Sequence, residues 1–116
     1  MSPTARSLNY LKSLNMLPAV VESYNSFTQR RKDAFGFLDI IAISDSGTMG
    51  VQTTTLSNMS ARLNKIKGEC REAAAMWLRA GNWLTIHGWY KEPLKEGSKA
   101  VRWKVKVVEL DIRDLC

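Results

Sequence analysis

The strongest constraint on the fold is the apolar run Phe37–Ile43, which leaves neither face of a strand polar enough to meet water. Such a run predicts a central strand covered on both sides, and Asp39 is its single charged residue. Turn residues follow at Asp45–Gly47. Met49–Thr55 is rich in β-branched residues and predicts a second, neighbouring strand. The centre of the fold is therefore expected to be a covered sheet that contains one carboxyl group.

Helices are predicted before and after this strand pair in the sequence. Ser2 as N-cap and Pro3 at the first helical position begin one helix, whose apolar stripe runs to about Asn15. A second helix, capped by Ser57 or Ser60, is predicted to run as far as Gly81. Its apolar residues recur at helical steps: Leu63, Ile66, Cys70, Ala73 and Trp77.

The remaining segments predict further strands. Leu17–Tyr24 favours a strand, and Asn25–Asp33 is expected to be a polar, basic connector. Trp83–Tyr90 predicts another strand, and Val101–Leu110 predicts an edge strand with its valines facing in and its lysines facing out. The predicted order is α-β-β-β-α-β-β in a single domain, residues 1–116. The predicted fold class is α/β, with a mixed central sheet flanked by helices.

Composition narrows the classes of function. Seventeen Lys and Arg against eleven Asp and Glu give a net charge of +6, which favours polyanionic partners. His87 is the single histidine, which excludes zinc sites with several histidines, and it is expected to be structural. Cys70 and Cys116 cannot form a disulfide framework. No apolar segment reaches the ~18 residues that span a bilayer, and no signal peptide is visible, so we expect a cytoplasmic protein without membrane association.

An ionised carboxylate in an apolar strand is costly unless it is paired, capped or bound to a metal ion. Asp39 therefore has two interpretations. In the first, it lies at a strand end and accepts hydrogen bonds from a neighbouring loop. In the second, it is a metal ligand at the point where adjacent strands diverge, and water and substrate phosphate oxygens complete the coordination of Mg²⁺.

The run GFLDIIAI, a glycine-containing turn, MGVQTTT and a long helix together resemble the PD-(D/E)XK nuclease superfamily over about residues 4–90. Within it, the chain looks most similar to archaeal Holliday-junction resolvases and short phage-encoded nuclease-like proteins. The resemblance implies a restriction-endonuclease-like fold and a metal-dependent endonuclease that cuts DNA, including branched structures such as Holliday junctions, by attack of metal-activated water on a phosphodiester. It further implies DNA as partner, allows a homodimer, and suggests a bacterial or phage-infected cell.

The resemblance also assigns roles to particular residues. Leu38-Asp39 stands where the superfamily has Pro-Asp, so Asp39 is implied to be the principal metal ligand. Gln52 stands in the place of the glutamate, and Thr54 in the place of the lysine, of the Glu-x-Lys motif. Asp39 and Gln52 are thus implied to hold Mg²⁺ or Mn²⁺. A glutamine oxygen brings no charge, and a threonine cannot replace the electrostatics of an ammonium group.

Other side chains are candidates for the groups that this motif lacks. Lys65 or Arg62, from the following helix, is a candidate for the missing cation. Glu22 or Asp33 is a candidate for a second carboxylate. The alternative for either acid is a solvated or salt-bridged surface position.

Basic side chains precede and follow the Asp39 strand in the sequence. A run of such residues is commonly a solvated face, but two clusters beside one metal site would also hold a phosphate backbone. The candidate DNA contacts are Arg30, Arg31, Lys32, Arg62, Lys65 and Lys67. The four tryptophans (Trp77, Trp83, Trp89 and Trp103) are expected in the core rather than as stacking platforms for bases.

Three functions stay open on the sequence alone. The first is a Mg²⁺- or Mn²⁺-dependent endodeoxyribonuclease. The second is a catalytically impaired nuclease-like module that binds DNA or a protein partner without cutting, which the incomplete Glu-x-Lys motif favours. The third is a structural or assembly protein with a basic surface.

Overall fold

A five-stranded sheet forms the centre of the molecule in the computed structural model, which describes residues 1–115. Its strands lie in the order β1-β4-β5-β6-β7. Only β5 and β6 are parallel, and the other neighbours are antiparallel, so the sheet is mixed, as predicted. The bounds are β1 Leu17–Val20, β4 Ile40–Ser44, β5 Gly47–Thr55, β6 Trp83–Pro93 and β7 Val101–Leu110. Cys116 lies outside the described residues.

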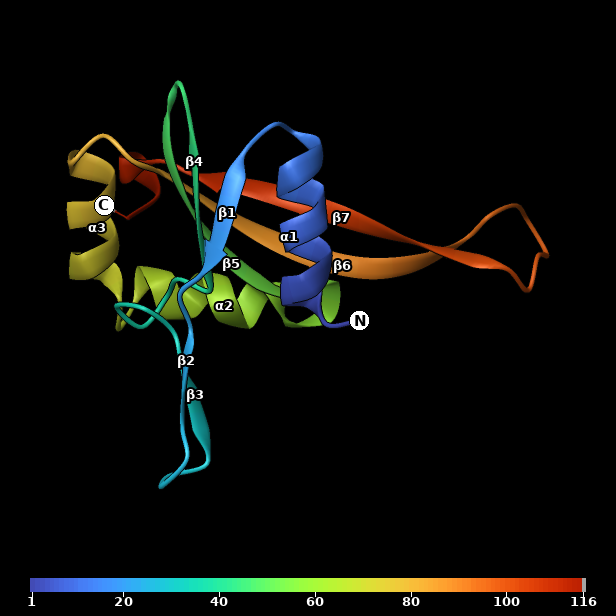
Figure 1. Cartoon of the computed structure of the whole chain (residues 1–116), viewed down its shortest axis with the longest axis horizontal. Coiled ribbons are helices and arrows are strands. Elements are labelled where there is room, and N and C mark those ends of the chain that lie inside the picture. The colour runs from blue at the N-terminus through green and yellow to red at the C-terminus, as the bar shows by residue number, and fades with distance from the viewer. Residues whose placement is uncertain (116) are drawn as a thin grey trace.

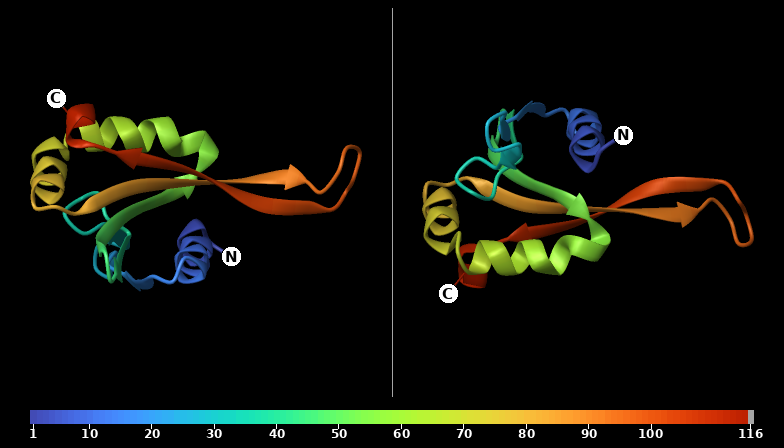
Figure 2. Two further views of the ribbon diagram at one scale, coloured as in Figure 1. Left: turned by 90° about the horizontal axis from the view of Figure 1, so that it is seen from above. Right: turned by 90° about the horizontal axis from the view of Figure 1, so that it is seen from below.

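Helices cover the two faces of this sheet (Figure 2). The first helix, α1 (Pro3–Ser13), lies on one face. On the other lie α2 (Met59–Lys67), entered through a 3₁₀ turn η1 (Leu56–Asn58), and α3 (Arg71–Arg79). A C-terminal 3₁₀ turn, η2 (Ile112–Leu115), packs beside α3. The chain is therefore a single-domain α/β protein. No helix in residues 1–115 is long and apolar enough to cross a membrane.

Each helical layer closes its own apolar cluster against the sheet. Leu11 of α1 packs with Ile40 and Val51 on one face. Ile66 of α2 belongs to the cluster that contains Leu84 of β6 on the other. The sheet is therefore covered on both faces at its centre, where Ile40 and Val51 are buried, whereas Ile43 near the end of β4 is 49% exposed.

The predicted strand Phe37–Ile43 begins three residues later than expected, at Ile40. A tight loop takes up the first part, and Phe35 and Gly36 both have positive φ there. The loop closes through a pair of backbone hydrogen bonds between Ala34 and Leu38, of 2.8 and 3.0 Å. Asp39 is therefore not within the strand but immediately before it.

The predicted connector Asn25–Asp33 is wrong, because this segment belongs to a second, two-stranded sheet. Here β2 (Ser23–Asn25) pairs antiparallel with β3 (Arg30–Lys32). This β2–β3 hairpin projects from the body of the molecule (Figure 1). All of its strand residues are exposed, so no inward face left an alternating pattern in the sequence.

The single helix predicted up to Gly81 is in fact two helices. Gly68 caps the C-terminus of α2, and the chain turns before α3 begins at Arg71. The predicted serine caps are also wrong, since Asn58 precedes α2 and makes no side-chain capping bond. The apolar stripe nevertheless spans both helices, because Ile66 and Trp77 contribute to the same cluster.

The edge position of β7 is confirmed, but its valines are not buried. The β6–β7 hairpin extends beyond the helices (Figure 1), so no layer covers that part of the strand. Trp103 is exposed for the same reason, and Trp83, at the other end of β6, is exposed as well, whereas Trp89 is buried, as predicted. Trp103 instead stacks under the guanidinium group of Arg6, 3.8 Å from the ring centre.

Candidate metal centre

Asp39 lies where β4 separates from β5. Its backbone N–H donates to the carbonyl of Val51 (2.9 Å), which extends the β4–β5 pairing by one residue. Beyond that point the edge of β5 has no strand beside it. The Asp39 carboxylate lies there instead, and its Oδ2 accepts a hydrogen bond from the backbone N–H of Thr53 at 2.7 Å. The Asp39 carboxylate thus takes the hydrogen bond that a neighbouring strand would otherwise accept from β5. It therefore caps a strand edge, as the first interpretation predicts, at the point of strand divergence that the metal interpretation requires.

Asp39 and Gln52 are in contact, as the strand pairing predicted. Gln52 Nε2 donates to Asp39 Oδ2 at 2.6 Å and to Asp33 Oδ2 at 3.3 Å. The amide nitrogen thus faces the acids, not the amide oxygen that a metal ligand would present. Gln52 Oε1 is buried and has no hydrogen-bond partner in residues 1–115. The nitrogen of the Gln52 amide is therefore hydrogen-bonded, whereas its oxygen lacks a donor.

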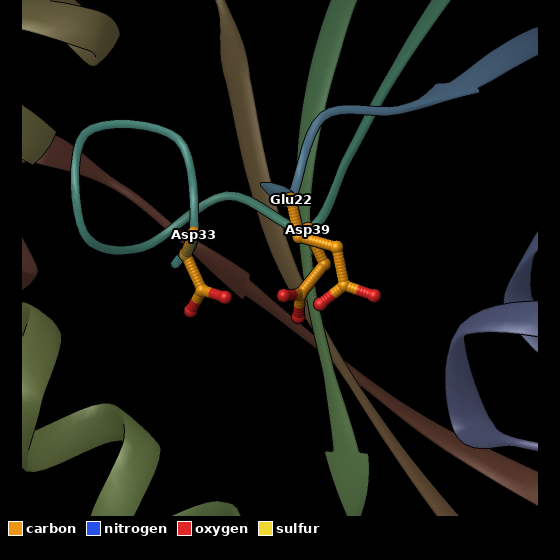
Figure 3. A group of neighbouring side chains, drawn as sticks. All are labelled: Glu22, Asp33 and Asp39. Atoms are coloured by element: carbon orange, nitrogen blue, oxygen red, sulfur yellow. The ribbon is translucent and has the colours of Figure 1, made fainter. Parts of the chain in front are cut away.

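Two further acids reach Asp39 from the base of the β2–β3 hairpin. Glu22 lies directly before β2, because Val21 N–H donates to the Asp39 carbonyl (2.8 Å) and aligns the two segments. Asp33 lies directly after β3, and the closed loop from Ala34 to Leu38 returns the chain to Asp39. One carboxylate oxygen of each acid lies within 4.8 Å of the others. Figure 3 shows the three side chains directed to one space beside β5, and we call Glu22, Asp33 and Asp39 the acidic cluster.

Crowding of the acids changes the ionisation of Asp39. Burial, the hydrogen bond and negative charge of Asp33, and the negative charge of Glu22 together raise the pKa of Asp39 to about 7, with burial the largest cause. The Thr53 N–H acts in the opposite direction. At neutral pH the cluster therefore retains a proton for part of the time, which is the response expected of acids that lack a cation.

A cleft of about 750 Å³ opens over the acidic cluster. Four basic and four acidic side chains line it, so it is neutral when all of them are ionised: Arg31, Lys32, Arg62 and Lys65 with Glu22, Asp33, Asp39 and Glu69. Lys65 Nζ lies 4.0 Å from Asp33 Oδ2, and an Arg31 nitrogen lies 3.5 Å from Glu22 Oε1. Thr54 lines the cleft as well.

The predicted basic residues separate into two sets. Those named above face the cleft, from β3 and from α2. Arg30 lies outside it and lines a separate groove on the β2–β3 hairpin, and Lys67 lines neither hollow. The structure thus brings Lys65, Arg62 and Thr54 to the cleft and leaves Lys67 away from it.

His87 is buried and structural in its contacts, on the sheet face covered by α1. Its Nδ1 lies 2.9 Å from Ser7 Oγ, which also accepts a hydrogen bond from Trp89 Nε1 at 2.9 Å. Burial lowers the pKa of His87 to about 4, so the ring is neutral at pH 7. We call Ser7, His87 and Trp89 the neutral cluster.

Sequence reasoning missed Thr53 as a site residue. Alternation assigns Thr53 and Gln52 to opposite faces of β5, yet both donate to Asp39 Oδ2, Thr53 through its hydroxyl (3.2 Å) as well as its backbone. The reason is that Asp39 lies beside the strand edge, from which one carboxylate reaches both faces. The polar run Gln52–Thr55 was the one available signal.

Comparisons with protein-family models, with curated proteins and with solved structures found no match to this chain. Any function proposed for it therefore rests on its own residues.

Proposed function

We propose that the protein is a metal-dependent endonuclease that hydrolyses phosphodiesters in DNA. The observation that carries this proposal is the acidic cluster, three carboxylates within 4.8 Å of one another in a cleft lined by four basic side chains. Acids at such separation repel one another unless a proton or cation lies between them. Basic residues around the rim are the groups that hold a phosphate backbone.

The donor set fits a hard divalent cation. Carboxylate and amide oxygens are the ligands that Mg²⁺ and Mn²⁺ prefer. Asp39, Asp33 and Glu22 would hold the ion, and rotation of the Gln52 amide by 180° would turn its unpartnered Oε1 toward the same space. Such an ion supplies Lewis acidity and lowers the pKa of bound water.

Charge balance in the cleft supports the same assignment. With four positive and four negative side chains, the cleft has no net positive charge with which to attract a phosphate group. A divalent ion on the acids would change this balance to +2. Lys65 Nζ, 4.0 Å from Asp33 Oδ2, can balance only one of the three acids. With a divalent ion on the acids, Lys65 and Arg62 could contact a phosphate oxygen, and Thr54 could orient one with its hydroxyl.

The fold is proposed to be restriction-endonuclease-like. Its support is the order α-β-β-β-α-β-β of the main-sheet elements, apart from the inserted hairpin and the divided second helix. The position of Asp39 at the divergence of β4 and β5 also agrees with the resemblance. The homodimer and the cytoplasm of a bacterial or phage-infected cell stay predictions.

A second function, DNA binding without cleavage, is favoured by one observation. The Gln52 amide group already donates to two of the three acids, so it partly replaces the cation. Together with threonine in place of lysine at position 54, this describes a site that stays folded without metal. The two functions differ in whether a divalent ion binds and whether DNA is cut.

Cleavage of linear, flapped and four-way DNA in Mg²⁺ or Mn²⁺ tests the proposal. Asp39→Asn removes the central carboxylate and should lower the rate by on the order of a thousandfold. Asp45→Asn, in the exposed β4–β5 turn, is the matched control and should leave the rate unchanged. Asp39→Asn that cuts as fast as wild type would contradict a role for the acidic cluster.

Restoring the Glu-x-Lys motif at positions 52 and 54 tests whether the protein is an impaired nuclease or a module that binds DNA without cutting. Gln52→Glu adds a fourth carboxylate and should tighten Mn²⁺ binding, as measured by calorimetry. Combined with Thr54→Lys, it should raise cleavage more than either change alone, because both groups act on one transition state. If wild type and the double variant are inert on every DNA with either metal, the protein is not a nuclease, and binding without cleavage becomes the proposal to test.

A further inference from the structure

The tip of the β2–β3 hairpin carries an aromatic side chain that nothing in residues 1–115 covers. Phe27 is 98% exposed, the highest value among the exposed large hydrophobic residues described. The hairpin projects away from the sheet and helices (Figure 1). An apolar ring held in water at the end of an arm gains nothing for the stability of this fold. At the end of the arm, the ring is placed where it can contact an apolar or π surface of a partner.

The backbone of the turn that carries Phe27 is held by side-chain hydrogen bonds. Asn25 Oδ1 accepts from the N–H of Phe27 at 2.9 Å and from the N–H of Thr28 at 3.3 Å. Gln29 completes the turn with a φ of 55°. Because the side chain of Asn25 fixes this turn, little backbone entropy is left to lose when Phe27 meets a partner.

The rest of the hairpin identifies the partner as a polyanion. Ser23–Lys32 contains three basic residues and no acidic one. A groove of about 620 Å³ on it is lined by basic and polar groups: Asn25, Thr28, Arg30, Arg31 and Lys32. Arg31 and Lys32 also line the cleft over the acidic cluster, so the groove and the cleft share two basic side chains. A polyanion with π surfaces along it is a nucleic acid.

We propose that the hairpin holds the DNA backbone in this groove while Phe27 stacks on a base that has left the duplex stack. This inference rests on the proposed function, which places DNA in the adjoining cleft. Aromatic and apolar wedges act in this way where base pairs are opened or unstacked. Phe27 thereby selects DNA that contains unstacked bases over intact duplex.

The length of the hairpin sets where the cut falls. From Glu22 to Phe27 the chain advances five residues, at most about 16 Å at ~3.3 Å per residue. One strand of duplex rises ~3.4 Å per base. The scissile phosphate should therefore lie within about five nucleotides of the unstacked base.

The test measures binding without cleavage, by fluorescence anisotropy of wild type in EDTA. A 30-base-pair duplex is compared with the same duplex carrying a two-base bulge. Wild type should bind the bulged DNA about tenfold more tightly. Phe27→Ala should bind both DNAs alike, and Phe27→Leu should keep only a small part of the preference. Leu94→Ala, which shortens an exposed apolar residue near the end of the other hairpin, should keep all of it.

A second readout locates the contact. 5-Iodouracil in the bulge should crosslink under ultraviolet light to the peptide that contains Phe27, and mass spectrometry identifies it. Equal affinity of wild type for the two DNAs, or a crosslink on another segment, overturns the inference even if the protein cuts DNA. Loss of the preference in Phe27→Ala supports it even if no DNA is cut. The failure of this inference and the failure of the proposed activity are thus distinguished.

Discussion

The acidic cluster and the neutral cluster both gather polar side chains beside β5 and β6, but their hydrogen-bonding groups and charges are satisfied in different ways. In the neutral cluster, Ser7 Oγ lies at 2.9 Å from His87 Nδ1 and accepts from Trp89 Nε1, and no charge is present at pH 7. In the acidic cluster, Asp33 and Asp39 share the donors of Gln52 and Thr53, Glu22 accepts from neither, and Gln52 Oε1 has no partner. The first is complete as folded, whereas the second needs a positive charge.

The two clusters shift pKa values for the same physical reason, in opposite directions. Burial disfavours the charged form, so the pKa of Asp39 rises to about 7 and the pKa of His87 falls to about 4. Only the shift of Asp39 brings a group into the physiological range of titration. A buried neutral histidine supports the fold, while a buried acid that titrates near pH 7 can exchange its proton for a metal ion.

The largest expected effect is on stability at Asp39. In the unfolded chain its carboxyl group ionises near 3.8, and in the folded protein near 7. Between these values the folded state holds a proton that the unfolded state has lost, so the free energy of unfolding decreases as pH rises through this window. Asp39→Asn carries no charge and should be more stable than wild type by about 2–4 kcal/mol at pH 8 in EDTA, in urea unfolding.

The same comparison at pH 3.5 should give nearly equal stabilities, because the carboxyl group is then protonated in both states. His87 contributes oppositely, since its depressed pKa removes stability as pH falls from 6.5 to about 4, but this contribution is common to both proteins and cancels. Asp45→Asn controls for a general effect of removing a negative charge. If Asp39→Asn is less stable than wild type at pH 8, the bond from Thr53 outweighs the repulsion and Asp39 is mainly a capping residue.

The neutral cluster should respond in the opposite sense. Ser7→Ala leaves Trp89 Nε1 without its acceptor and His87 Nδ1 without its partner, so the free energy of unfolding should fall by about 1–3 kcal/mol. The loss should be the same at pH 7 and 8, because His87 is neutral at both. Urea unfolding measures it, and cleavage per folded molecule should be unchanged.

Ser13→Ala on the same helix is the matched control for this variant. Ser13 Oγ donates to the Tyr10 carbonyl at an exposed position, where water can replace it. Its removal should therefore change stability by about 0.5 kcal/mol or less. A loss in Ser7→Ala no larger than in Ser13→Ala would show that the neutral cluster does not support the fold.

The sequence predicts those parts of the fold that have a buried face. The apolar faces of β4 and β5 identify the strand pair, and this pair alone puts Asp39 beside Gln52. The β2–β3 hairpin could not be found in this way, since its residues are exposed on both sides. Without this hairpin, the sequence offers no reason for Glu22 and Asp33 to lie side by side at its base.

The acidic cluster depends further on a local conformation that composition does not reveal. Asp33 and Asp39 meet because Phe35 has a φ of 56° and the loop closes between Ala34 and Leu38. Phenylalanine rarely adopts that conformation, so no turn signal other than Gly36 was visible. Spacing in sequence identifies these residues only as candidates, and the tertiary structure decides which of them lie together.

The smallest expected effect compares the two buried polar atoms that lack partners. Thr85 Oγ1 is unpartnered in residues 1–115, on the same face of β6 as His87, and has no role in either cluster. Thr85→Val keeps the shape and removes the hydroxyl group, so it should raise the free energy of unfolding by about 0.5–1 kcal/mol and leave cleavage unchanged.

Gln52→Met should instead lower the free energy of unfolding. The variant loses the 2.6 Å hydrogen bond from Nε2 to Asp39, and the acids then repel one another more strongly. If both variants gain stability, Gln52 is as dispensable as Thr85 and the acidic cluster does not depend on it; opposite signs show that the hydrogen bonds of Gln52 Nε2 to the acids outweigh the cost of its unpartnered oxygen.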